Sequence, residues 1–152
     1  TALPETNTIA ATAGETALSF GLDENQFPST THMTLEASVV ENSVLQQRLM
    51  ITMERVSLVA GTTYDCHERS ETTASTEAKV QLVVKTAAAN TADYSTANGG
   101  RCRITIDSVT IGGPTNSSIL GVSGRFVGEL LPFRRNLPAI TVDDGVFRYV
   151  AP

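Results

Sequence analysis

Two cysteines and two histidines are among the residues of this sequence whose side chains could carry covalent, acid–base or metal chemistry. His67 directly follows Cys66, with Asp65 and Glu68 on either side, whereas His32 stands alone. A cysteine nucleophile needs an imidazole within hydrogen-bond reach of its thiol. Adjacent residues of a strand point to opposite faces, which works against cooperation between Cys66 and His67. We therefore interpret the cluster as structural and assign no catalytic residue.

Cys66 and Cys102 form the candidate disulfide. Two cysteines allow a single intramolecular pairing, which would close a loop of about 37 residues. The chain-entropy model gives roughly 3.5–4 kcal/mol of stabilisation for such a loop. A bond of this kind persists in exported proteins, and the Thr- and Ser-rich composition suits that setting. The alternative is two free buried thiols in a cytosolic protein.

The carboxylates of Asp143 and Asp144 are candidate calcium ligands. The segment Asp143-Asp144-Gly145 lacks the regular spacing of a calcium loop, however, and its residue types favour a tight hairpin turn. Asp23, Glu24 and Asn25 form a second carboxylate cluster, which is either a calcium site or a polar loop. Ser123 lacks the surroundings of a nucleophile elbow, so we expect an outward-facing strand residue. Without zinc, phosphate-loop or dinucleotide motifs, the sequence predicts no metal and no cofactor.

The composition limits the classes of function. The chain has 152 residues and a net charge of −5, which argues against nucleic-acid binding. No run approaches the roughly 20 apolar residues of a membrane helix. The chain begins with Thr1 rather than Met, so we expect a processed form, and a signal peptide or lipid-anchor cysteine upstream stays possible.

Alternation of apolar and polar residues predicts most of the elements. Residues 41–56 allow either a helix or a strand, and we favour a strand over 48–54. The apolar phase of 102–111 slips by one residue, which predicts a bulge or break near Asp107 and Ser108. The segment 119–150 reads as the central strand and closing hairpin, with Leu120, Phe126 and their alternate neighbours facing inward. Polar loops are expected at 67–78, 87–100 and 112–118.

These elements give about eight or nine short strands without helical segments between them. The predicted fold is all-β, a single-domain antiparallel β-sandwich or small β-barrel over residues 17–152. Residues 1–16 are small and polar and are expected to form a flexible arm or an edge strand.

Three segments resemble the C-terminal end of several bacterial secreted or lipoprotein β-sandwich domain families, most of them uncharacterised. They are Gly-Arg-Cys-Arg-Ile-Thr-Ile at 100–106, Ser-Gly-Arg-Phe-Val-Gly-Glu-Leu at 123–130, and Ile-Thr-Val-Asp-Asp-Gly-Val-Phe at 140–147. The resemblance implies an all-β fold and export, and it transfers no catalytic residue.

The preferred function is an exported, non-enzymatic domain that binds a partner in the periplasm, at the outer membrane surface or outside the cell. A protein partner is favoured over a glycan, because the chain has no Trp and three Tyr for stacking on sugars. One alternative is a structural subunit of a surface assembly, with residues 1–16 as the strand to exchange. The other is a calycin-like carrier of a small molecule inside a barrel.

Overall fold

The computed structural model contains ten strands in its described residues. The structure describes residues 7–23, 32–41, 44–54, 58–66, 77–85, 91–95, 100–112, 118–132 and 138–151. The strands are β1 (Thr8–Ala13), β2 (Thr16–Gly21), β3 (His32–Glu41), β4 (Val44–Glu54), β5 (Thr63–Cys66), β6 (Glu77–Lys85), β7 (Thr91–Ser95), β8 (Arg101–Gly112), β9 (Ser118–Pro132) and β10 (Ile140–Val150).

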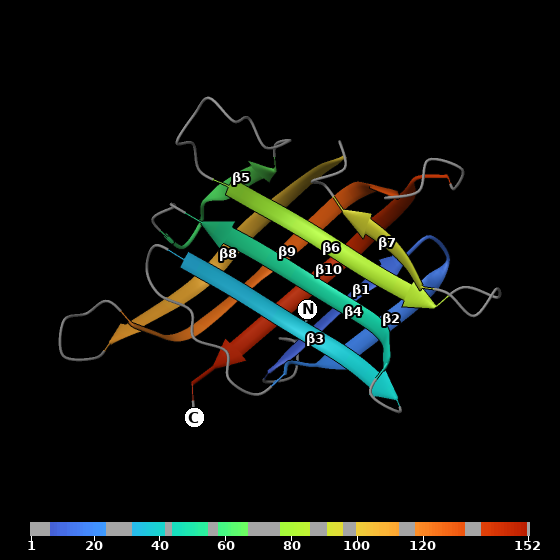
Figure 1. The fold of residues 1–152 in the computed structure, drawn as a ribbon. Coiled ribbons are helices and arrows are strands. Elements are labelled where there is room, and N and C mark those ends of the chain that lie inside the picture. Colours follow the sequence, from blue (N-terminus) through green and yellow to red (C-terminus); the bar gives the residue numbers. More distant parts are fainter. Residues whose placement is uncertain are drawn as a thin grey trace.

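Every pairing between these strands is antiparallel, and the strands form two layers. One layer has the order β2-β1-β10-β9-β8-β5, and the other has the order β7-β6-β4-β3. Figure 1 shows β3, β4 and β6 crossing in front of β8, β9 and β10. The far end of β9 joins the layers, because Leu131 and Pro132 pair with β7. The predicted all-β antiparallel fold is confirmed.

The barrel alternative is wrong. The path of hydrogen-bonded strands ends at β2 and at β3, and no ladder between those two strands is present among the described residues. Among the described residues, one backbone hydrogen bond links the two ends, from the Asp23 N–H to the Glu36 carbonyl, 2.8 Å long. The molecule is therefore a β-sandwich-like fold with open edges.

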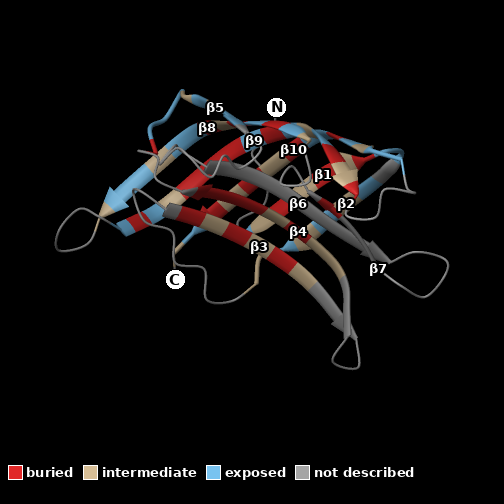
Figure 2. Ribbon diagram, turned by 45° about the horizontal axis from the view of Figure 1, so that its top comes forward, coloured by how far each residue is buried: buried red, intermediate tan, exposed pale blue. Residues whose placement is uncertain are grey.

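The core lies between the two layers and is built mainly from aliphatic side chains. Alternate residues of β3, β4, β8, β9 and β10 point into it, as the period of two of a half-buried strand requires (Figure 2). Its largest fully buried side chains are those of Phe126, Phe147, Ile9, Met33, Leu35, Leu49, Ile51, Met53, Ile104, Ile106 and Leu130.

The register of the β8–β9 ladder shifts at two bulges. The predicted bulge near Asp107 is confirmed, because the register of the β8–β9 ladder shifts between Ile106 and Ser108. A second shift, between Thr110 and Ile111, leaves Leu120 as the extra residue of β9. The inward orientation expected for Leu120 is therefore wrong: Leu120 is 43% exposed, and Ile119 is buried in its place.

The segment Asp143-Asp144-Gly145 forms a bulge inside β10, and the hairpin turn expected for it is wrong. Val142 pairs with Gly128 and Gly145 pairs with Phe126, so two aspartates lie opposite one residue of β9. Asp144 has a positive φ of 52°, a conformation that aspartate tolerates better than most residues. Asp and Gly, which also suit turns, here form a bulge within β10, which is paired with β1 on one side and β9 on the other.

Two other segments differ from their expected form, and a third is longer than expected. Residues 8–13, expected in a flexible arm or edge strand, form β1, which pairs with β2 on one side and β10 on the other. Residues 91–95, expected in a loop, form β7 between β6 and β9. The strand expected over 48–54 is confirmed and begins earlier, at Val44. Of the loops expected over 67–78 and 112–118, residues 67–76 and 113–117 lie outside the described residues, and the remaining positions belong to strands.

Candidate functional site

The backbone places the two cysteines opposite each other. Cys66 is the last residue of β5 and pairs directly with Cys102 of β8. Cys102 is buried, with 6% of its surface exposed. His67, which follows Cys66, lies outside the described residues, and the side chain of His32 does as well. The catalytic geometry considered for Cys66 and His67 is therefore not tested.

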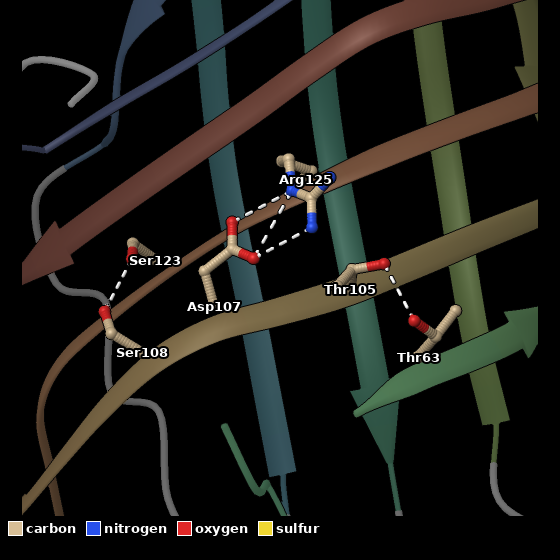
Figure 3. A network of polar contacts seen from close by, with 6 residues as sticks. All are labelled: Thr63, Thr105, Asp107, Ser108, Ser123 and Arg125. Carbon is tan, nitrogen blue, oxygen red and sulfur yellow. Dashed lines mark hydrogen bonds and ion pairs between the residues drawn. The ribbon is translucent and has the colours of Figure 1, made fainter. Parts of the chain in front are cut away.

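Ser123 lies in a hydroxyl pair and not at a strand-to-helix turn. Its Oγ is 2.6 Å from the Oγ of Ser108, across the bulge of β8 (Figure 3). Only 9% of Ser123 is exposed, whereas an outward-facing serine was expected. The register shift at Asp107 brings Ser108 over Ser123 and covers it. This arrangement satisfies two hydroxyl groups and fixes the bulge.

The candidate calcium ligands Asp143 and Asp144 are both exposed on β10. Within the described residues, no group of three or more His, Cys, Asp or Glu side chains is placed to hold a metal ion. The Asp23 carboxylate instead forms hydrogen bonds with β3. It accepts hydrogen bonds from the N–H and the Oγ of Ser38, each 2.9 Å long. These contacts attach the end of β2 to β3.

An open depression lies on the outer face of β5, β8 and β9, which is the face turned away from β3, β4 and β6. Its volume is about 440 Å³. We call it the charged groove, and it is lined by Asp65, Arg101, Cys102, Arg103, Val127, Gly128 and Glu129.

The strand register explains how these residues meet. Arg101 and Arg103 alternate on β8, so both point outward with the buried Cys102 between them. Arg101 lies opposite Glu129, and Arg103 lies between Val127 on β9 and Asp65 on β5. Val127 is 45% exposed and sits among these charged side chains. The result is an apolar spot surrounded by charges of both signs.

The charges of the groove contribute little to folding. The Arg103 Nε lies 3.3 Å from the Asp65 Oδ1, and the two side chains are 65% and 61% exposed. Ion pairs this exposed add little net stability, because water already solvates both groups. A guanidinium can instead bind a carboxylate in a bidentate manner when a partner excludes the water.

A second row of polar side chains borders the groove on the same face (Figure 3). The hydroxyl groups of Thr63 and Thr105 are 3.0 Å apart, and the Arg125 Nη2 lies 3.1 Å from the Asp107 Oδ1. The hydrogen bond and the negative charge of Asp107 raise the pKa of Arg125 above its usual value.

The charged groove was not predicted from the sequence. The available signal was Arg-Cys-Arg at 101–103, where alternation puts two arginines on one face of a strand. Their acidic neighbours Asp65 and Glu129 are distant in sequence, and only the strand order brings them together.

No family model matches the chain, and no curated protein or solved structure matches it either. None of the described segments forms a helix with the length and apolar character needed to cross a membrane.

Proposed function

We propose that the chain is a non-enzymatic binding domain whose partner is a protein that docks on the charged groove. The observation that carries this proposal is the grouping of Arg101, Arg103, Asp65 and Glu129 around the exposed Val127. Arginine is enriched at protein interfaces, and a small apolar centre with a polar rim is typical of them. Charges of both signs would select a partner with a complementary pattern.

The composition of the groove favours a protein over a glycan. Sugar sites use aromatic side chains as stacking platforms. None of the described residues that line the groove is aromatic. Two arginines and two carboxylates offer bidentate partners for the charged side chains of a protein.

The pairing of Cys66 with Cys102 supports an exported location. Directly opposed residues of antiparallel strands have Cα atoms about 4.5–5.5 Å apart. Disulfides span Cα separations of about 4.4–6.8 Å, so this register accommodates a bond without a movement of the backbone. We propose that the two cysteines form a cross-strand disulfide that holds β5, and with it Asp65, against β8. Such a bond would persist in the periplasm, at the cell surface or outside the cell.

Photo-crosslinking from position 127 in living cells of the source organism tests the proposed binding face. A benzophenone side chain at Val127 should capture a protein partner, and Arg101→Glu should remove the adduct.

A further inference from the structure

The edges of this sandwich are protected to different degrees, and the edge of β3 is blocked. The Asp23 N–H donates to the Glu36 carbonyl, while the Asp23 Oδ1 accepts from the Ser38 N–H. A residue of a parallel strand would bond to the same two groups, with its carbonyl in place of the carboxylate. Asp23 therefore imitates one residue of a neighbouring strand and occupies the middle of this edge. Natural β-proteins use such devices against unwanted strand pairing.

The far half of β8 has no comparable cover among the described residues. The contact with the β5 side ends at Ile106, whose N–H donates to the Thr62 carbonyl and whose carbonyl accepts from the Gly61 N–H. Residues 107–112 pair only with β9 in the described part of the chain. By the alternation of a ladder, Val109 and Ile111 present their N–H and carbonyl groups to this open edge.

The same half of β8 projects beyond the other layer and carries apolar side chains. Figure 1 shows the end of β8 and the start of β9 extending past β3, and Figure 2 shows this end of β8 as exposed. Ile111 is 46% exposed. Leu120 lies over Gly112, since a Cβ at Gly112 would be only 2.9 Å from the Leu120 Cγ. The open edge is therefore flanked by apolar side chains on both faces of the sheet.

We propose that the open edge of 107–112 accepts an extended segment of the partner protein as an additional antiparallel or parallel strand. This inference rests on the proposed protein-binding function and gives the form of the bound segment. A row of backbone donors and acceptors selects an extended backbone, and Val109 and Ile111 select apolar side chains at alternate positions.

Charge distinguishes the partner's strand from a second copy of this chain. Residues 108–112 are uncharged, and the acid at their start, Asp107, is paired with Arg125. The whole chain carries a net charge of −5, so two copies would repel each other as they approached. A neutral or basic segment of another protein has no such penalty.

The test uses a phage library of random decapeptides, panned on the immobilised wild-type domain. We expect the recovered peptides to alternate apolar and polar residues and to slow hydrogen exchange at the Val109 and Ile111 amides. Ile111→Pro removes the edge N–H and should weaken binding at least tenfold, whereas Ile111→Val keeps the N–H and should bind within about twofold of wild type. Circular dichroism verifies that both variants are folded.

Three outcomes would overturn the inference. The first is a failure to enrich any peptide, and the second is equal binding by wild type and Ile111→Pro without amide protection at the edge. The third is a wild-type dimer in light scattering that Ile111→Pro dissociates, which would make a second copy the occupant. The two proposals fail separately. If Arg101→Glu loses peptide binding and Ile111→Pro keeps it, strand addition at the edge is rejected and docking on the charged groove is supported.

Discussion

Gly145 of β10 lies directly against Phe126 of β9, with no room between them for a side chain. A Cβ at position 145 would be 2.6 Å from the Phe126 Cδ2. Phe126 is in turn one of the largest buried side chains and lies 6.4 Å from the ring centre of Phe147. The bulge formed by Asp143 and Asp144 brings Gly145 into this position. The glycine thus lets the central strands pack closely over a fully buried aromatic ring of the core.

Gly145→Ala should destabilise the domain by about 2–3 kcal/mol, because the methyl group forces the ring or the strand to move. Urea unfolding followed by circular dichroism measures the change. Gly21→Ala is the matched control, since a Cβ there meets no atom within 4 Å. We expect the control to change the free energy of unfolding by less than about 0.5 kcal/mol. Equal effects of the two substitutions would contradict the packing described for Phe126.

The proposed disulfide makes a prediction about thiol content. The non-reduced, denatured protein should show no reactive thiol, and prior reduction should release two. Cys102→Ser should lower the free energy of unfolding by roughly 3.5–4 kcal/mol, because the unfolded chain regains the freedom of a loop of about 37 residues. Two reactive thiols without reductant would show that Cys66 and Cys102 face each other unbonded, and would remove this support for export.

Asp23 should protect the edge of β3 as well as stabilise it. Asp23→Ala leaves the Ser38 N–H without its acceptor and should cost about 1–2 kcal/mol in urea unfolding. The uncovered edge should also increase concentration-dependent association in light scattering. Asp143→Ala removes an exposed carboxylate of β10 and serves as the control. A strictly monomeric Asp23→Ala variant with wild-type stability would refute the blocking role.

Tyr149 gives the domain a pH dependence at alkaline pH. Burial raises the pKa of Tyr149 above its ordinary value of about 10, because the phenolate would lose its hydration. In the unfolded chain the phenol ionises first, so the folded state holds more protons and the free energy of unfolding falls as the pH rises above about 10. Urea midpoints at about pH 8 and about pH 11 should differ less in Tyr149→Phe than in wild type. An identical pH dependence in both proteins would exclude Tyr149 as its source.

The strand pattern predicted the fold class because alternation depends on local sequence and burial alone. It also predicted the bulge at Asp107, since the apolar phase visibly slips there. The inward orientation predicted for Leu120 was wrong because consecutive residues, Ile119 and Leu120, are both apolar at the second bulge. Alternation therefore does not show which of them faces the core. The hairpin turn predicted for Asp143-Asp144-Gly145 was wrong. The same residue types tolerate a positive φ in a turn and in a bulge, so they do not distinguish the two.

The candidate surfaces were harder to predict, because they depend on which strands become neighbours. β5 is a short edge strand, and its pairing with β8 brings Asp65 to Arg103. In the part of the chain that the structure describes, the edge of β8 is open beyond Ile106, because the contacts of Gly61 and Thr62, just before β5, end there. The alternation of apolar and polar residues within β8 depends neither on the strand order nor on the length of the neighbouring strand. It therefore predicts neither.

Photo-crosslinking at Val127 tests the central claim, that a protein partner docks on the charged groove, most directly. Val127 is replaced by p-benzoylphenylalanine in cells of the source organism, with Val59, which is 54% exposed outside the groove, as the control position. We expect a discrete protein adduct from position 127 and none from position 59. Arg101→Glu should abolish that adduct, whereas Glu15→Lys, a charge reversal at an exposed residue between β1 and β2, should preserve it. An absent adduct, or one that is insensitive to Arg101→Glu, would contradict the account.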